Sequence, residues 1–499
     1  MPTSKAAKAE REIRRSGPFG KLRVYLKALG PGLITGAADD DPSGIGTYSQ
    51  TGAQFGYVHL WTALFTFPLM AGIQEICARI ALHTGTGIAD LIRKHYPKPV
   101  LYFCVSLLFV ANTVNLGTDL GAMAASCQLL LGLPFLVWLI AITLVSTILE
   151  IFLNYKKYAQ VLRFLTLSLL AYILVVFVTP QDWGQVLRHA FIPTIQFNKD
   201  HLLNLVAILG TTISPYLFFW IASQEIEEEI EEGKTIPAER KGVSKVELKW
   251  MRTDVISGML FSNLIMWFII ATAASTLFPH GITTIDSAPK AAEALKPIAG
   301  HFAYLVFAAG IIGTGLLAVP ILAGSAAYAV AETFRFREGL YLKLRKAPGF
   351  YGVIIFSTLV GFAINLIGIN PIRALYYTAV LNGIVAPPLL LMIMLISNNH
   401  HIMKDKVNNR ITNTLGWLIT VSLTSAAATL LLTLGLGQKE KSLSANQESD
   451  LHTYTLFGVE IYSSRRPYTV HRGEPFPRRH MTPRVVRKGT SPLSLKTAC

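Results

Sequence analysis

Three consecutive aspartates, Asp39, Asp40 and Asp41, stand inside an otherwise apolar segment near the start of the chain and are followed by Pro42-Ser43-Gly44. A charged carboxylate within a long hydrophobic segment costs several kcal/mol unless it is paired or binds a cation. Successive helical residues point about 100° apart, so only one of the three carboxylates can face a given site. Asp41 adjoins the proline that must interrupt the helix. The pattern predicts a cation site with Asp41 as its carboxylate, beside a helix break at Pro42 and Ser43.

A second apolar segment is interrupted in the same way, at Thr211-Thr212-Ile213-Ser214-Pro215-Tyr216. Unwound backbone within a membrane is tolerated only inside protein or beside a water-filled cavity, where its free carbonyls can coordinate a cation. No His, Cys or Met falls at either break, and oxygen-only coordination suits Mg2+ or Mn2+. The predicted ligands of the metal ion are Asp41, Gly44, Thr211, Ser214 and Asn382, and the helix-break residues are Pro42, Ser43, Pro215 and Tyr216.

Other carboxylates of the chain have one or two interpretations each. Asp119 is predicted to carry a proton or to act as an outer-sphere ligand, or else to be a carboxylate hydrogen-bonded to a neighbouring helix. Asp39 and Asp40 line the approach to the site or serve the structure alone. Glu75 and Arg79 are expected to form an interfacial pair, and the run Glu225 to Glu232 is expected to be a solvated helix face.

The elements that must position these residues are membrane helices. The chain has 499 residues, of which 52% are hydrophobic and 15% charged, with a mean hydropathy of +0.44, too apolar for a soluble protein of this length. Long apolar segments favour helices over a barrel, which would show short alternating segments. Eleven spans are predicted, at about 26–50, 57–82, 99–131, 135–154, 157–179, 200–223, 252–278, 298–333, 349–369, 371–396 and 411–436.

The positive charges set the orientation and the limits of the domains. Lysines and arginines gather in the N-terminal tail and in alternate loops, which the positive-inside rule places in the cytoplasm. The predicted organisation is a basic cytoplasmic tail over 1–25, a membrane domain over 26–436 and a basic, disordered tail over 437–499. We expect a multi-pass protein of the bacterial inner membrane with a cytoplasmic N-terminus.

The same observations argue against several other functions. The net charge of +15 lies in loops and tails, where it orients helices and contacts anionic lipid, so no nucleic-acid partner is expected. The four cysteines show neither a disulfide pattern nor metal-ligand spacing. We predict that the chain is not an enzyme, that it holds no cofactor, and that its partners are the bilayer and a transported ion, without an obligate protein partner.

Two broken helices five spans apart predict a five-plus-five inverted repeat with its site at the membrane midplane. Beyond this, Gly30-Pro31-Gly32-Leu33 leading into Asp41-Pro42-Ser43-Gly44 resembles the opening of the Nramp metal-ion transporters, whose first helix carries Asp-Pro-Gly-Asn. Segment 74–90, Thr118-Asp119-Leu120 and Pro215 resemble that family as well. The resemblance covers about 30–436 and implies a LeuT-type fold.

The departures from the family pattern bear on the ion. The position of the family's ligand Asn is Gly44, and the position of its ligand Met is Ser214. The usual small residue one turn earlier is Thr211, and the His after the helix-six proline is Tyr216. The helix-three Glu that follows the Asp by one turn in the family is Ala122 here. The soft ligand and most of the groups implicated in proton coupling are therefore missing, apart from Asp119.

This combination resembles the Nramp-related magnesium transporter branch, whose first-helix signature is also Asp-Pro-Ser-Gly. The resemblance implies import of Mg2+, and of Mn2+, by alternating access, with proton coupling weak or absent. The first alternative is a proton-coupled Mn2+/Fe2+ symporter that uses Asp119. A Na+-coupled carrier of organic solutes is a second alternative, disfavoured because Asp41 would repel a substrate carboxylate, and a non-transporting sensor is a third.

Overall fold

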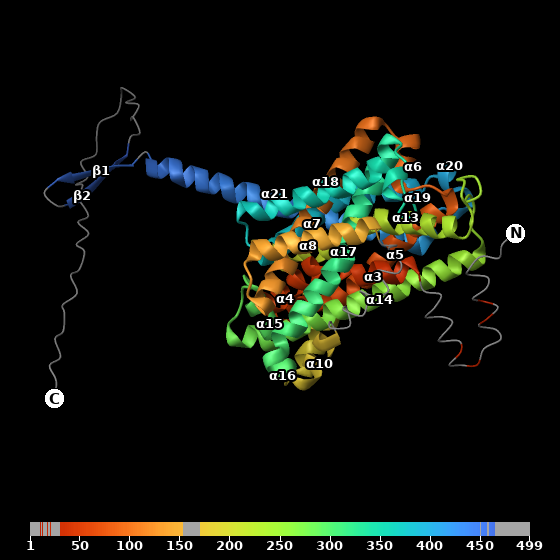
Figure 1. Cartoon of the computed structure of the whole chain (residues 1–499). Coiled ribbons are helices and arrows are strands. Elements are labelled where there is room, and N and C mark those ends of the chain that lie inside the picture. The colour runs from red at the N-terminus through yellow and green to blue at the C-terminus, as the bar shows by residue number, and fades with distance from the viewer. Residues whose placement is uncertain are drawn as a thin grey trace, which may run out of the picture. The chain divides into compact units, whose positions relative to one another are not determined.

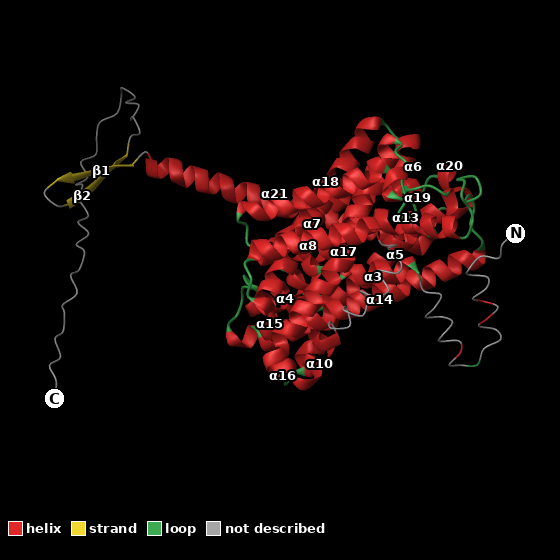
Figure 2. Ribbon diagram, viewed as in Figure 1, coloured by secondary structure: helices red, strands yellow, loops and turns green. Residues whose placement is uncertain are grey.

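The computed structural model describes residues 10, 12, 17, 20, 30–152, 170–449, 451–456 and 459–464, in two units, 1–434 and 435–499. The first unit is a bundle of helices, several of which run the length of the bundle (Figure 1). Figure 2 shows that helices account for nearly all regular structure, since the described strands are confined to β1 and β2. Over the described residues of its apolar part, the chain is helical, as predicted.

The elements of the first unit follow in chain order. The α-helices are α3 (Pro31–Asp39), α4 (Pro42–Phe55), α5 (Trp61–Thr84), α6 (Ile88–His95), α7 (Lys98–Leu131), α8 (Phe135–Phe152), α10 (Leu170–Val178), α11 (Trp183–Phe191), α12 (Lys199–Thr212), α13 (Pro215–Glu231), α14 (Lys245–Thr276), α15 (Ala288–Ala292), α16 (Lys296–Ala299), α17 (Ala303–Phe334), α18 (Pro348–Ile364), α19 (Pro371–Ser397), α20 (His400–Met403) and α21 (Arg410–Ser449). Short 3-10 helices include η1 (Gly56–His59) and η6 (Leu344–Lys346).

Nine helical segments in the described part of the chain are long and apolar enough to cross a membrane. Eleven spans are predicted from the sequence. The first predicted span corresponds to α3 and α4 together, since neither helix is long enough to cross a membrane alone. The predicted span 157–179 is represented by α10, since residues 153–169 lie outside the described residues. The count of eleven and the inverted repeat therefore stay predictions.

The break in the first predicted span lies where the sequence places it. Helix α3 ends at Asp39, and α4 begins at Pro42. Asp41, in extended conformation with φ −65° and ψ 171°, is the N-cap of α4, and its side chain accepts a hydrogen bond from the Gly44 N–H. Aspartate is a favoured N-cap, and a proline at the first helical position gives up no helical hydrogen bond. The sequence Asp-Pro-Ser-Gly thus ends one helix and starts the next.

The second break has the same construction. Helix α12 ends at Thr212, and α13 begins at Pro215 with extended Ser214 as its N-cap. In this case the capping residue makes no side-chain bond to the new helix. The Ser214 hydroxyl instead donates to the Thr211 carbonyl oxygen at 2.6 Å and to the Gly210 carbonyl oxygen at 3.0 Å. The two predicted interruptions are therefore confirmed.

Helix α3 is held against α14 by a close approach of backbones. A Cβ atom added to Gly36 would lie 2.2 Å from the Gly258 carbonyl oxygen, and one added to Gly258 would lie 2.1 Å from the Gly32 carbonyl oxygen. Small residues permit this separation, which is typical of helix pairs in membranes. The Asp254 carboxylate of α14 also accepts hydrogen bonds from the N–H groups of Gly30 and Gly32, at 2.9 and 2.7 Å. These contacts fix the helix that delivers Asp41.

The prediction of a solvated acidic face over Glu225 to Glu232 is wrong for three of its residues, whereas Glu231 is exposed. Helix α13 continues to Glu231, and Glu225, Glu227 and Glu229 are 5 to 6% exposed. Two of these buried carboxylates have partners. Glu227 accepts a hydrogen bond from the Tyr328 hydroxyl at 2.6 Å, and Glu229 pairs with Lys234 at 2.9 Å. These partners come from distant or looping segments that helical periodicity does not reveal.

The expected pair between Glu75 and Arg79 is confirmed at 3.1 Å. Arg252 of α14 also reaches the Glu75 carboxylate, at 2.9 Å. The pair is buried, with side-chain exposures of 3% for Arg79 and 9% for Glu75. Through Arg252, which lies near the start of α14, this cluster links α5 to α14.

The second unit begins at Gly435, and the predicted end of the membrane domain at 436 stays a prediction. Helix α21 continues to Ser449, and strands β1 (Leu451–Leu456) and β2 (Val459–Ser464) pair antiparallel. Alternating Thr, Tyr, Val and Ile residues have high strand propensity, which accounts for a hairpin within a basic segment. The predicted disorder of the tail stays a prediction for 465–499, which lie outside the described residues.

Candidate metal site

Asp41 lies at the centre of a hydrogen-bond network between the two helix breaks. It is 1% exposed, and its Oδ1 accepts from the Ser43 hydroxyl and from the Gly44 N–H, both at 2.7 Å. Its Oδ2 accepts from the Asn115 amide at 2.9 Å and from the Tyr216 hydroxyl at 3.3 Å. Four donors thus occupy the lone-pair directions of one carboxylate.

The network connects the two breaks directly. The Ser43 hydroxyl lies 3.4 Å from the Thr211 hydroxyl, which joins the start of α4 to the end of α12. The Tyr216 hydroxyl donates to the Ala38 carbonyl oxygen at 3.0 Å, which joins the start of α13 to the end of α3. The sequence-predicted residues Asp41, Ser43, Thr211 and Tyr216 are thus brought together. An arriving cation can replace a hydroxyl donor, which turns and offers its oxygen instead.

Asp39 and Asp40 point to a different helix from Asp41. Asp39 Oδ2 accepts from the Ser262 hydroxyl of α14 at 2.5 Å, and Asp40 Oδ1 lies 3.4 Å from the same hydroxyl. Both aspartates are fully buried. Within the described ranges, no three His, Cys, Asp or Glu side chains are grouped so as to hold a metal ion. The expectation that only one of the three carboxylates serves the site agrees with this arrangement.

Asp119 and Asn382 are buried close to this network. Asp119 is fully buried, near enough to Asp41 for the two carboxylates to repel, and the backbone N–H of Ser43 interacts with its carboxylate. Asn382 is 1% exposed, and its amide nitrogen has no partner in the described part of the chain. Its neighbour Gly383 closely contacts Gly210, one residue before Thr211. The roles of Asp119 and Asn382 remain predictions.

The sequence-based reasoning missed Asn115. This residue of α7 is fully buried and donates to the Asp41 carboxylate, yet it was not among the predicted site residues. One signal could have found it. Asn115 precedes Asp119 by four residues, so the two share a helix face, and a polar face on an apolar helix points to the bundle interior.

Replacing Asn115 by Ala is expected to weaken metal transport, raising the half-saturating concentration of Mn2+ by about 10- to 100-fold. The reason is that Asp41, the predicted ligand, loses a partner that orients its carboxylate while the carboxylate itself stays. Uptake of Mn2+ into liposomes measures this effect. Asn112→Ala is the matched control, since Asn112 is on the same helix and donates to the Leu322 carbonyl oxygen at 3.2 Å instead. Equal kinetics for the two variants would contradict the role given to Asn115.

His59, in η1 between the first two spans, pairs with His201 of α12, apart from the network of Asp41. In η1, His59 Nε2 is 3.1 Å from His201 Nδ1, and Phe55 contacts both rings. Burial, together with the neighbouring His201, lowers the pKa of His59 from its ordinary value of 6.5 to about 3. The folded protein therefore binds fewer protons at this residue than the unfolded chain does between about pH 3 and pH 6.5.

The apparent melting temperature should accordingly fall as the pH drops below about 6.5, because the unfolded state then takes up the proton. One such group contributes at most about 1.4 kcal/mol per pH unit within this window. Thermal unfolding of the purified protein at pH 7.5 and pH 5 tests this. His59→Phe should reduce the pH dependence more than His400→Phe does, a control at an exposed histidine of α20. An unaltered pH dependence in His59→Phe would refute the assignment.

Known proteins resemble this chain over most of its length. A family model described as "Natural resistance-associated macrophage protein-like", Nramp, matches residues 32–433. The chain is 26% identical over 430 residues to a protein of Klebsiella pneumoniae named "Divalent metal cation transporter MntH", covering 85% of this chain and 98% of the relative. A protein of the same name from Deinococcus radiodurans is 27% identical over 417 residues, covering 81% of this chain and 89% of the relative.

Among solved structures, a manganese transporter of Eremococcus coleocola, in complex with an aromatic bis-isothiourea substituted compound, superimposes with a TM-score of 0.65. The sequence identity is 15%, and the match covers 83% of this chain and 87% of the other. At this identity the likeness concerns the fold alone.

Proposed function

Since this chain belongs to the Nramp family, and is a multi-pass membrane transporter of divalent metal cations rather than an enzyme, we propose that it imports Mg2+ as well as Mn2+. The ion binds between the two helix breaks. Asp41 supplies the charge, and Thr211, Ser214, Asn382 and the carbonyl oxygen of Gly44 supply the remaining oxygens. We place the protein in the magnesium branch of the family, in the bacterial inner membrane with a cytoplasmic N-terminus.

The observation that carries this proposal is the donor set around Asp41. The groups that donate hydrogen bonds to the carboxylate are the hydroxyls of Ser43 and Tyr216 and the N–H groups of Gly44 and Asn115, with no sulfur or imidazole among them. Hard oxygen donors bind Mg2+ and Mn2+ and give softer metals no advantage. Asp41 is the one charged ligand in this set, and any position that the protein does not fill is left to water, which Mg2+ gives up reluctantly. Import of a dication is driven by the membrane potential, at about 2.3 kcal/mol per charge per 100 mV.

A proton-coupled Mn2+/Fe2+ symporter is the second candidate, and the names of the relatives favour it over the magnesium assignment. Two relatives are named for divalent metal cations and the solved neighbour for manganese, whereas none of them is named for magnesium. Asp119 supports this candidate too, because it is fully buried beside Asp41 and pairs with no cation in the described part of the chain. Such a carboxylate can take up a proton when the metal leaves.

Uptake by the purified full-length chain in liposomes separates the two candidates. With an inward-negative potential we expect Mg2+ and Mn2+ to enter, each inhibiting the other, while a pH dye inside the vesicles records no metal-dependent acidification. Exclusion of Mg2+ would overturn the magnesium assignment. Acidification that accompanies Mn2+ entry, and that is lost in Asp119→Asn, would establish the symporter instead.

A further inference from the structure

An apolar groove opens on the outside of the bundle, away from the residues that surround Asp41. It has a volume of about 490 Å3 and is formed by α7, α17 and α18. Its lining is Tyr102, Val105, Ser106, Phe109, Val110, Val330, Thr333, Phe334, Gly349, Gly352, Val353 and Phe356. From Tyr102 to Val110 the groove follows α7 over eight residues, or about 12 Å, which matches the length of part of a fatty acyl chain.

Glycines and aromatic rings give the groove its shape. Gly352 of α18 has open space where a Cβ atom would stand, while a Cβ atom at Gly349 would meet the Phe336 ring at 2.8 Å. Tyr102 stacks on Phe334 at one end, with ring centroids 6.2 Å apart. Phe109 stacks on Phe356 farther along, also at 6.2 Å. The groove is therefore an open trough with aromatic walls.

The surroundings of this trough are hydrocarbon rather than water. Tyr102, Val110 and Phe356 are 47%, 53% and 58% exposed, yet they belong to helices long and apolar enough to span a membrane. Exposed apolar side chains on such helices face lipid. A trough in this surface takes up an acyl chain more closely than a flat helix face does.

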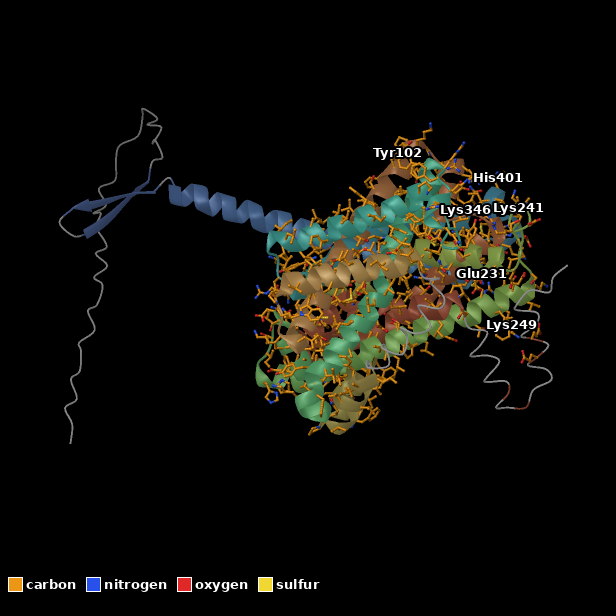
Figure 3. All side chains as sticks on the ribbon, in the orientation of Figure 1. Tyr102, Glu231, Lys241, Lys249, Lys346 and His401 are labelled. Atoms are coloured by element: carbon orange, nitrogen blue, oxygen red, sulfur yellow. The ribbon has the colours of Figure 1, made fainter. Side chains whose placement is uncertain are left out.

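Five exposed cations gather at the Tyr102 end. Lys98 precedes Tyr102 by one helical turn and so lies on the same face of α7. Arg335 directly follows the groove residue Phe334, and Arg337 lies two residues further on. Arg345 and Lys346, in η6, precede Gly349 by three or four residues. None of the five forms an ion pair with a residue in the described ranges. Figure 3 shows Tyr102 and Lys346 on the part of the bundle where α6, α18 and α19 are labelled in Figure 1.

The nearest acidic residue does not neutralise this group. Glu338 follows Arg337 in the chain and is partly buried. Burial, with Glu332, Asp90 and Glu227 nearby, raises the pKa of Glu338 to about 9. The end of the groove is therefore positively charged at neutral pH and complements a phosphate.

We propose that the groove is a binding site for one anionic phospholipid, with an acyl chain in the trough and the phosphate among Lys98, Arg335, Arg337, Arg345 and Lys346. The charge complementarity selects this occupant over a zwitterionic lipid. It also selects it over a second copy of the chain, whose matching face would carry the same cations. The site is independent of which ion the protein transports.

Photo-crosslinking locates such a lipid. The full-length chain is placed in nanodiscs of phosphatidylcholine containing a small fraction of phosphatidylglycerol with a diazirine on its acyl chain. After irradiation, labelled peptides are identified by mass spectrometry. We expect labelling concentrated in 102–110, 330–334 and 349–356, displaced at least about fivefold more effectively by unlabelled phosphatidylglycerol than by added phosphatidylcholine.

Two variants test the two halves of the site. Gly352→Leu fills the trough, since nothing lies within 4 Å of the added Cβ atom, and should remove labelling there while labelling elsewhere on the protein persists. Arg345→Gln with Lys346→Gln should reduce the preference for phosphatidylglycerol by about tenfold. Lys245→Gln with Lys249→Gln, at the start of α14, removes two exposed charges at a distant place and should change nothing.

Equal competition by the two unlabelled lipids would show ordinary contact with the surrounding bilayer and would overturn the proposal. Labelling that persists in Gly352→Leu would overturn it as well. So would an equal loss of the preference for phosphatidylglycerol in the Arg345/Lys346 and the Lys245/Lys249 double variants. Crosslinks between two copies of the chain through these peptides would assign the groove to a dimer interface instead.

Discussion

Uptake of Mg2+ and Mn2+ is expected to fall at least about a hundredfold when Asp41 is replaced by Asn. The substitution keeps the size of the side chain and an oxygen that can accept from Ser43 and Gly44, but it removes the charge. A partly dehydrated dication at this site then loses its one directly bound carboxylate, and a loss of about 3 kcal/mol in binding is already a factor of about a hundred. Initial rates of uptake into liposomes measure the effect.

Asp405→Asn is the matched control for this change. Asp405 is 73% exposed and pairs with its neighbour Lys406 at 2.8 Å, so the same loss of charge occurs far from the breaks. We expect wild-type uptake in this variant and an unchanged elution profile for both purified proteins. Retention of more than half of the wild-type rate in Asp41→Asn would refute the metal site.

The second large effect is expected on selectivity. Combining Ser214→Met with Gly44→Asn should raise the ratio of Mn2+ to Mg2+ uptake at least about tenfold. A thioether is a soft ligand that Mn2+ accepts and Mg2+ does not, and the amide adds one more protein ligand at the expense of water. The hydroxyl of Ser214 now donates to the carbonyl oxygens of Gly210 and Thr211, so methionine also releases those carbonyls. Competition between the two ions for uptake gives the ratio.

The structure sets the conditions for this experiment. A Cβ atom at Gly44 would lie 3.1 Å from the Asp39 carbonyl oxygen, which is tight, so Ser214→Met alone is tested beside the double variant. Ser223→Met is the control, because Ser223 is a buried serine on the same helix α13 and its hydroxyl donates to the Phe219 carbonyl oxygen at 2.9 Å. A similar shift in Ser223→Met, or no shift in the double variant, would show that the identity of residue 214 does not set selectivity.

Features encoded in a few adjacent residues could be predicted from the sequence. Both helix breaks follow from a proline in an apolar segment, and the structure has them at Asp41–Pro42 and Ser214–Pro215. The hydrogen bonds that link Ser43 to Thr211 and Tyr216 to Asp41 agree with the prediction that the two breaks meet. The Glu75–Arg79 pair, at i and i+4, is likewise a local feature.

Features that depend on segments distant in sequence could not be predicted in this way. The burial of Glu227 requires Tyr328, which is 101 residues away, and the contact of Asn115 with Asp41 spans 74 residues. Helical periodicity shows which face a residue occupies, but it does not show which helix covers that face. The preference among ions could not be predicted for the same reason. The number of water molecules that the ion keeps depends on the space between helices that are distant in the sequence.

The most direct test of the central claim is diffraction from crystals of the full-length protein grown with Mn2+, recorded where manganese scatters anomalously. We predict an anomalous peak between Asp41 and the Thr211–Ser214 segment, with oxygen atoms as the only protein ligands, and its loss when Mg2+ is added in excess. A peak at the His59–His201 pair with none at Asp41, or one at Asp41 that excess Mg2+ leaves intact, would contradict this account.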